Sequence, residues 1–365
     1  MRIAQVSPLF ESVPPQKYGG TERIASYLTE GLMSLGHQVT LFASGDSTTS
    51  ACLISSCSQS IRLHSGYDHD VIPHFVMFEE LLRRQTDFDL IHFHTDYFHY
   101  PFARRLKVPF VTTLHGRLDL HPLHSLYREY GDLPFISISD AQRAPLPDLN
   151  WRATIHHGLP PDLYHFQPGL GKYAAFLGRI SPEKGLDRAI EIAEKAQVPL
   201  KIAAKIDPKE QNYFERNIGP LIRNSSFVEF IGEIDDSQKN EFLGNASALL
   251  FPINWPEPFG LVMIEALACG TPVIAYRQGS TPEVIDENIT GFLVDSVDEA
   301  ATHLRSIQKL DRARCRRVFE KRFSLPTMLQ SQLDLYEQLI EEPLRPLNKA
   351  SLLWKTYSSS TIRSI

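Results

Sequence analysis

Short apolar runs alternate with longer amphipathic stretches along the chain, and this alternation begins again after a break near the middle. Alternation of this kind is typical of parallel strands joined by helical crossovers. The break, residues 158–170, is rich in Pro and Gly and has no hydrophobic periodicity, as expected of a linker. The sequence therefore predicts an α/β protein with two doubly wound parallel-sheet domains.

This alternation also sets the expected elements and domain limits. In the first half we expect strands at residues 3–6, 38–43, 90–94, 110–114, 135–139 and near 154–156, and a helix over 22–35 that stops at Gly36. In the second half we expect strands at 174–178, 200–204, 228–231, 248–251, 273–275 and 292–294, and helices over 183–196, 210–218, 238–244 and 261–268. The expected domains are residues 1–158 and 171–325, with a linker at 159–170, a C-terminal helix at 326–345 that packs back toward the first domain, and a tail at 346–365.

Composition and charge exclude several classes of protein. The 365 residues, 42% hydrophobic and 22% charged, suffice for two buried cores. A net charge of −6 without blocks of like charge argues against non-specific nucleic-acid binding. No window approaches the roughly 18 apolar residues that span a bilayer, so membrane association is expected to be peripheral at most. Four scattered cysteines and the lack of a secretory signal predict a cytoplasmic protein.

Two glutamates with seven intervening residues bracket the predicted start of a helix after an apolar strand. Pro258 disfavours the α conformation of Glu257, which places Glu257 on the loop before the helix. The backbone amides of Gly260, Leu261 and Val262 then have no helical partner and face the same space as Glu257. This arrangement suits an anionic or oxygen-rich ligand.

Glu265 lies on the helix itself, whose other residues are apolar on every face, so its carboxylate is expected to be buried. A buried carboxylate needs a partner. An internal salt bridge is the more ordinary partner, and the paired hydroxyls of a ribose are the functional alternative, because one carboxylate can accept from both.

The segment from Gly178 to Gly185 follows another strand and carries two cations five positions apart. Arg179 offers a planar fork of donors and Lys184 a point charge, a combination that can clamp a diphosphate. An ordinary surface pair that orders a loop is the alternative.

These segments together resemble the retaining glycosyltransferases of family 4, which have the GT-B fold. The resemblance covers nearly the whole chain, through YGGTER at residues 18–23, LHG at 114–116, GRISPEKG at 178–185 and EPFGLVMIEALACGTPVIA at 257–275. It implies two Rossmann-like domains that face each other across a cleft and transfer a hexosyl group from a nucleotide diphosphate sugar to an acceptor hydroxyl. UDP-glucose is the favoured donor and GDP-mannose the second, the acceptor is unknown, and no cofactor or metal ion is implied.

The resemblance also assigns roles to single residues. Glu265 would bind the ribose hydroxyls, Glu257 the sugar hydroxyls near the reacting centre, and Arg179 and Lys184 the departing diphosphate. His115 would lie near the donor sugar. The implied backbone contacts to the donor come from Gly19, Gly20, Gly232, Phe259, Gly260 and Leu261.

Two features fit this assignment less directly. His92 and His94 alternate on one strand and invite a zinc hypothesis, but no cluster of carboxylates or cysteines completes a tetrahedral site, and His94 and Asp96 are better placed near the acceptor. The segment from Gly279 to Glu283 departs from the family pattern, so we expect Glu283 to order its own loop. Two other functions stay open: a non-hydrolysing nucleotide-sugar epimerase and a non-catalytic nucleotide-sugar-binding subunit.

Overall fold

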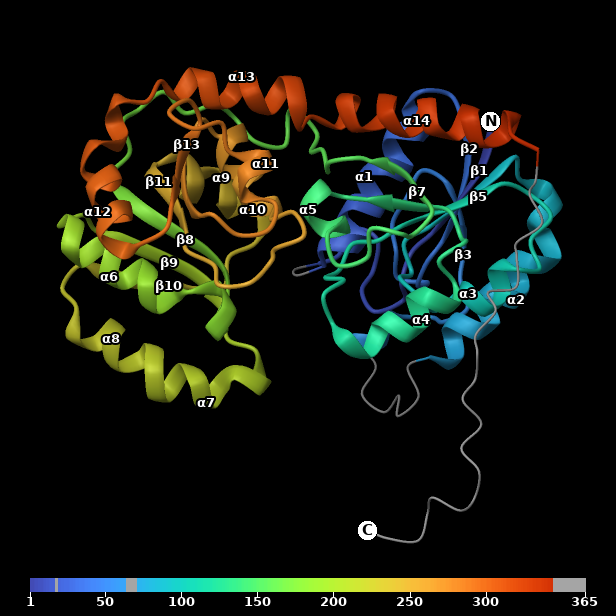
Figure 1. The fold of residues 1–365 in the computed structure, drawn as a ribbon, viewed down its shortest axis with the longest axis horizontal. Helices are drawn as coiled ribbons and strands as arrows, with labels where there is room; N and C mark the ends of the chain where they lie inside the picture. The colour runs from blue at the N-terminus through green and yellow to red at the C-terminus, as the bar shows by residue number, and fades with distance from the viewer. Residues whose placement is uncertain (17–18, 64–70, 344–365) are drawn as a thin grey trace, which may run out of the picture.

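Two parallel β-sheets organise the chain into two lobes, as the alternating pattern predicts (Figure 1). The computed structural model describes residues 1–16, 19–63 and 71–343. The first sheet has seven strands in the order β3-β2-β1-β4-β5-β6-β7 and the second has six in the order β10-β9-β8-β11-β12-β13. The strands of the first sheet are β1 (Arg2–Val6), β2 (Gln38–Phe42), β3 (Cys52–Ile54), β4 (Leu90–Phe93), β5 (Phe110–Thr113), β6 (Phe135–Ser137) and β7 (Trp151–Thr154). Those of the second are β8 (Tyr173–Arg179), β9 (Leu200–Lys205), β10 (Val228–Gly232), β11 (Ala246–Phe251), β12 (Val273–Tyr276) and β13 (Gly291–Val294).

Helices connect these strands and cover the sheets. In the first lobe they are α1 (Gly20–Ser34), α2 (Ile72–Arg84), α3 (Tyr100–Ala103), α4 (His124–Glu129) and α5 (Asp140–Arg143). The second lobe holds α6 (Leu186–Ala196), α7 (Gln211–Tyr213), α8 (Gly219–Asn224), α9 (Asp236–Gly244), α10 (Leu261–Ala268), α11 (Thr281–Val284), α12 (Val297–Ser306) and α13 (Arg312–Arg322). The strand order of each sheet reverses once, between β1 and β4 and between β8 and β11. Ligands of such sheets bind outside the strand ends at this reversal.

The last helix, α14 (Leu325–Glu341), leaves the second lobe and lies along the first (Figure 1). It packs on α1, where Leu329 and Leu335 join a cluster that contains Leu28 and Leu32. The two helices come so close that a Cβ atom on Gly31 would lie 2.6 Å from Leu329 Cδ1. Within the described residues the chain therefore crosses between the lobes twice, once near residue 158 and once at the start of α14. The tail at residues 346–365 lies outside the described residues.

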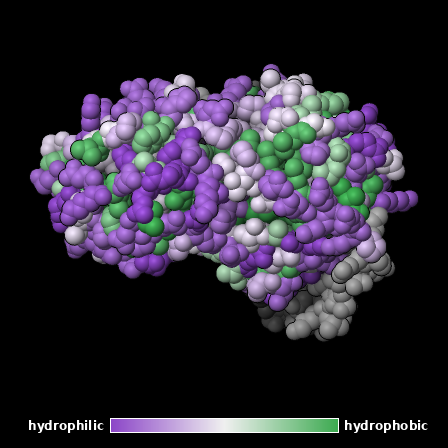
Figure 2. Space-filling view, turned by 90° about the horizontal axis from the view of Figure 1, so that it is seen from above, coloured by the Kyte–Doolittle hydropathy of each residue, from purple (hydrophilic) through white to green (hydrophobic). Residues whose placement is uncertain are grey.

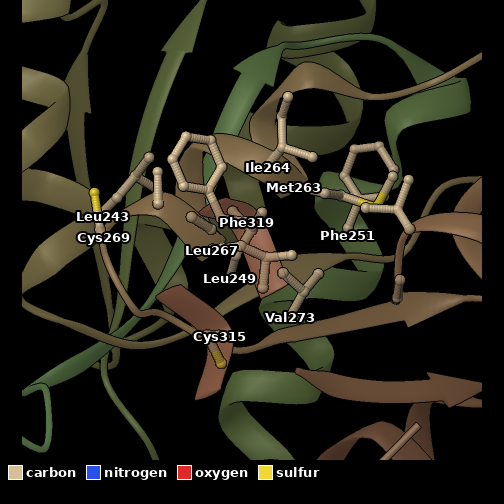
Figure 3. Packing of buried hydrophobic residues seen from close by; sticks show 14 of the residues in the cluster. Leu243, Leu249, Phe251, Met263, Ile264, Leu267, Cys269, Val273, Cys315 and Phe319 are labelled. Carbon is tan, nitrogen blue, oxygen red and sulfur yellow. The ribbon is translucent and has the colours of Figure 1, made fainter. Parts of the chain in front are cut away.

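The helix α10 is buried between the second sheet and α13, which explains why apolar residues surround it on every side. Figure 3 shows Met263, Ile264 and Leu267 of α10 among residues of β11, β12 and α13. The side chain of Phe319 on α13 is fully buried in this cluster. A helix packed this tightly is a rigid support for the loop that precedes it.

Some expected elements differ from the structure for local reasons. The helix expected over residues 183–196 is interrupted at Gly185, which has a φ of +69° and whose Cβ atom would lie 2.1 Å from the Pro252 carbonyl oxygen. The helix expected over residues 210–218 is α7 followed by a π-helical turn. The strand expected near residues 154–156 is β7, which starts and ends earlier. The strand β3 and the helices α2 and α12 were not expected at all.

No helix in residues 1–16, 19–63 and 71–343 has both the length and the apolarity to cross a bilayer. Seen from above, hydrophilic side chains cover most of the surface, and apolar ones gather in patches between them (Figure 2).

Replacing Gly36 by alanine is expected to lower the free energy of unfolding by about 1 kcal/mol. Gly36 follows the end of α1 with a φ of +85°, and a Cβ atom there would meet nothing within 4 Å, so the cost is backbone strain alone. Gly169→Ala is the matched control, because a Cβ atom at Gly169 also meets nothing within 4 Å and its φ lies outside the left-handed range. Urea unfolding of both variants measures the difference, and equal stabilities would contradict it.

Candidate active site

Two adjoining pockets open where the sheets reverse their strand order. The larger, about 630 Å³, lies between the lobes, and the smaller, about 180 Å³, adjoins it. The larger pocket is lined by most of the residues singled out from the sequence: Gly19, Gly20, His115, Arg179, Lys184, Glu257, Phe259, Gly260 and Leu261. The smaller one is lined by Glu265 and shares Gly19, Gly20, Arg179 and Leu261 with the larger. Gly232 is not among the described residues that line either pocket, although the next residue, Glu233, lines the smaller one.

The loop that carries Glu257 is held in place by the chain at Gly279. Gly279 has a φ of +55°, and a Cβ atom there would lie 2.4 Å from the backbone nitrogen of Glu257, so only glycine fits. The Ser280 amide donates to the Glu257 carbonyl at 3.0 Å. The Ser280 hydroxyl donates to the Phe259 carbonyl at 2.8 Å. These contacts fix the backbone from which the Glu257 side chain extends.

The Glu257 carboxylate is paired with the Lys184 ammonium, with 2.5 Å between Oε2 and Nζ. The two side chains are 11% and 18% exposed, so water screens this pair only weakly. The ammonium also lies 4.8 Å from the centre of the Trp255 ring. Arg179 extends from the end of β8 into the same pocket, with its Nη2 3.9 Å from Glu183 Oε1. Both predicted cations thus lie in the cleft, and Lys184 contacts the predicted sugar-binding carboxylate.

Two helix N-termini meet in the cleft, one from each lobe. Gly260 precedes α10 with a φ of +81°, and Gly20 begins α1. A Cβ atom on Gly20 would lie 3.7 Å from Cδ1 of Leu261, so the two helix ends are in van der Waals reach. The first amides of a helix have no partner within the helix and carry its partial positive charge. The arrangement suits an anion that touches both lobes.

Glu265 is 4% exposed, and its carboxylate has the cationic partner that a buried charge requires. The partner is Lys239 of α9, with 2.9 Å between Nζ and Oε1. The ammonium also lies 3.1 Å from Oδ1 of Asp236, whose other oxygen pairs with Arg23 of α1. The salt bridge that the sequence favours for an isolated glutamate is therefore present, yet Glu265 still lines the smaller pocket.

Sequence reasoning missed Lys239, Asp236 and Arg23. A buried carboxylate signals that some cation must face it, but the chain has 37 lysines and arginines, and only the packing of α9 and α1 around the pocket selects these.

His92 and His94 belong to a buried hydrogen-bonded network that ends at the cleft residue His115. His92 contacts the hydroxyls of Tyr336 and Thr113 at 2.6 and 2.8 Å. Its neighbour His94 contacts Gln5 Oε1 at 2.8 Å through Nε2 and His115 Nε2 at 2.9 Å through Nδ1. Both ring nitrogens of His92 and of His94, the residues that suggested a zinc site, are therefore occupied by hydrogen bonds within the protein.

This network selects one tautomer of His115. Burial lowers the pKa of His115 to about 3, so its ring is neutral. His94 must donate through Nε2 to the Gln5 oxygen, so its Nδ1 accepts from Nε2 of His115. The acceptor nitrogen of His115 is then Nδ1, which has no hydrogen-bond partner within the described part of the chain.

Asp96 lies on the wall of the cleft that the first lobe provides. Its φ of +46° is a backbone conformation that residues other than glycine rarely adopt, and such strain is concentrated at functional sites. Burial raises the pKa of its carboxyl to about 6, although a hydrogen bond from the His115 backbone acts in the opposite direction. His94, by contrast, is buried behind His115.

Glu283 contacts the opposite lobe, so the expectation that it orders its own loop is wrong. Its carboxylate accepts from the amides of Asp140 and Ala141 at 2.8 and 2.7 Å, and it lies 3.2 Å from Nε2 of His156. Burial alone would raise the pKa of this carboxyl, but the hydrogen bonds from His156 and the two amides lower it. The sequence gives no sign of this contact, because its partners precede Glu283 by more than 120 residues.

Comparisons with known proteins match both lobes. A family model described as glycosyl transferases group 1 matches residues 165–322, and one described as glycosyltransferase family 4 matches residues 18–140. The phosphatidyl-myo-inositol mannosyltransferase of Mycobacterium leprae is 26% identical over 334 residues, which are 82% of this chain and 85% of that protein.

Solved structures share the fold at lower identity. AviGT4, a glycosyltransferase involved in avilamycin A biosynthesis, superposes with a TM-score of 0.69 at 23% identity, over 94% of this chain and 99% of that one. Anabaena HepE in complex with UDP-glucose superposes with a TM-score of 0.69 at 17% identity, over 93% of this chain and 100% of that one.

Proposed function

We propose that this chain, which belongs to the family 4 glycosyltransferases with the GT-B fold, transfers a hexosyl group from a nucleotide diphosphate sugar to an acceptor hydroxyl with retention at the anomeric carbon. The observation that carries this proposal is the shared cleft: carboxylates and cations of the second lobe face the N-terminal end of α1 from the first. Glu257, Glu265 and the pair of Arg179 and Lys184 each suit one part of such a donor.

The proposed chemistry centres on the leaving diphosphate. The bond between the anomeric carbon and the phosphate oxygen breaks, and the acceptor oxygen forms a new bond on the same face of the sugar. The proton of the acceptor hydroxyl passes to the departing diphosphate. Arg179, Lys184 and the amides that begin α1 and α10 stabilise the charge that develops there, because they are already in position. These groups supply positive charge from the protein itself, so we propose that the reaction needs no metal ion.

Glu257 and Glu265 would bind the two polyol parts of the donor. Glu257 lies in the larger pocket beside Lys184, where it can accept hydrogen bonds from sugar hydroxyls. Glu265 lies in the smaller pocket and can accept from ribose hydroxyls. We place His115 near the sugar, on the opposite wall. We assign no nucleophile to the protein.

For the donor we propose UDP-glucose first. The same fold binds UDP-glucose in Anabaena HepE. GDP-mannose is the second choice, and a relative that is a mannosyltransferase keeps it open. The acceptor is a hydroxyl compound of unknown class, and we place the enzyme in the cytoplasm with peripheral membrane contact at most.

A thermal-shift panel of nucleoside diphosphates and their sugars tests the proposal. A ligand at 100 times its dissociation constant stabilises the protein by about 2.7 kcal/mol, so the true donor should stand out. Incubation with the donor alone separates the alternatives, because an epimerase would change the sugar without an acceptor and a binding subunit would leave it intact. A panel in which no nucleotide shifts the melting temperature would contradict the proposal.

We expect UDP-glucose to bind about 5- to 10-fold more tightly at pH 6 than at pH 8, because of Glu22. Glu22 lies in the first turn of α1 and lines the larger pocket, and burial raises the pKa of its carboxyl to about 7. Above that pH its negative charge would repel the diphosphate, and below it the group is neutral. Isothermal titration calorimetry across this range measures the effect. In Glu22→Gln the pH dependence should flatten, and an unchanged slope in that variant would rule Glu22 out as its cause.

A further inference from the structure

A chain of four alternating charges runs from the bottom of the smaller pocket across to the other lobe. It starts at Glu265, passes through Lys239 at 2.9 Å and Asp236 at 3.1 Å, and ends at Arg23 of α1. We propose that Lys239, Asp236 and Arg23 are positioning residues: they hold the Glu265 carboxylate toward the nucleoside and tie it to the arrangement in which Arg23 and Asp236 join the two lobes, which we call closed. This inference rests on the proposed function, in which Glu265 receives the ribose.

Lys239 acts within the second lobe. A carboxylate can accept about four hydrogen bonds, and the ammonium occupies one position on Oε1, which leaves acceptor positions for the nearby Tyr164 hydroxyl and for ligand hydroxyls. Lys239 also lines the pocket, with its side chain 16% exposed. Burial would lower the pKa of this ammonium, but Glu265 and Asp236 together raise it above its ordinary value, so the group stays charged. A fixed charge at this position sets the direction in which the glutamate points.

Arg23 joins the same chain from the first lobe. Its side chain is 8% exposed, and its guanidinium pairs with Asp236, the first residue of α9. Arg23 follows Gly19 and Gly20, whose loop lines both pockets, by one helical turn. If the lobes separated, the ion pair between the Arg23 guanidinium and the Asp236 carboxylate would break. The pair therefore favours the arrangement in which the start of α1 faces the phosphates.

Lys239 and Arg23, the two cations in this series of charges, have different expected effects on ligand binding. A ligand that needs the closed arrangement loses apparent affinity in proportion to the closed fraction. Loss of Arg23 should therefore weaken every nucleotide equally. Loss of Lys239 should instead weaken the selection for the ribose hydroxyls, because it releases the carboxylate that receives them.

Binding of UDP and of 2′-deoxy-UDP by calorimetry, with small-angle scattering of the unliganded protein, tests this inference. We expect Arg23→Met to weaken both nucleotides at least about 5-fold, to leave the ratio of their affinities unchanged and to increase the radius of gyration. Arg23→Lys should recover part of the loss. Lys239→Met should instead reduce the ratio of the affinity for UDP to the affinity for 2′-deoxy-UDP. The control Arg2→Met removes an exposed ion pair with Asp89 within the first lobe and should change nothing.

The outcomes separate this inference from the proposed function. If the wild-type protein bound no nucleoside diphosphate, the proposed function would fail first. If the wild-type protein bound UDP, and Arg23→Met bound both nucleotides as tightly as the wild type with an unchanged radius of gyration, the inference would be overturned. The inference would also be overturned if Arg23→Met reduced the preference for UDP over 2′-deoxy-UDP, because Arg23 would then act on the pocket directly and not through closure of the lobes. Asp236→Asn should weaken UDP as well, and adding Arg23→Met to it should have little further effect, since Asp236→Asn already removes the partner that Arg23 has on α9.

Discussion

Alanine in place of Arg179 should lower the turnover number about 10²- to 10³-fold, the cost of losing one donor that is already in position for the developing charge. Arg179 lies at the end of β8, where the second sheet reverses its strand order, and its side chain reaches both pockets. Release of nucleoside diphosphate from the donor chosen by the thermal-shift panel measures turnover. The control is Arg223→Ala, which removes an exposed arginine of α8. Wild-type turnover in Arg179→Ala would remove this residue from the mechanism.

The same change at Lys184 has two consequences that must be separated. Lys184→Ala removes a cation from the cleft, but it also leaves the Glu257 carboxylate, 11% exposed, without its partner. We therefore expect a similar loss of turnover together with a loss of stability of about 1–3 kcal/mol. Adding Glu257→Gln should restore the stability and not the turnover. Recovery of both would show that Lys184 serves only to neutralise Glu257.

The sequence predicts the fold because its signals are local. The apolar runs that become strands and the segment that becomes α10 can be recognised from a few neighbouring residues. Gly36 marks the end of α1 because the residue at this position has a left-handed backbone conformation, which glycine adopts most readily. The break at Gly185 was missed because it depends on the distant Pro252 carbonyl.

Most of the predicted site residues line the two adjoining pockets for the same reason. Arg179 ends β8 and Glu257 lies on the loop after β11, and the geometry of a doubly wound sheet brings such positions to one edge. What the sequence could not supply is the pairing between side chains. Lys184 and Glu257 carry separate roles in the motif and form one ion pair in the structure. Glu283 reaches across the lobes for a helix end that no local pattern relates to it.

Glu265→Ala should remove the preference of this protein for ribose over deoxyribose. In the wild-type protein we expect UDP to bind about 10- to 100-fold more tightly than 2′-deoxy-UDP, because a hydrogen bond to a charged group contributes roughly 1.5–3 kcal/mol. In Glu265→Ala the affinity for UDP should fall by a similar factor, and the two nucleotides should bind alike. Calorimetric titration of both nucleotides against both proteins completes a thermodynamic cycle, which isolates the contact from other effects of the substitution.

The charge left behind does not confound this experiment. When Glu265 is removed, the Lys239 ammonium keeps Asp236 at 3.1 Å, so no unpaired cation is buried and the fold should be retained. Glu265→Gln is the matched variant, because it keeps the size of the side chain and one acceptor oxygen while removing the charge. It should bind UDP with an intermediate affinity. If Glu265→Ala still preferred UDP to its deoxy form by the wild-type factor, the ribose would lie elsewhere, and Glu265 would be a structural partner of Lys239 alone.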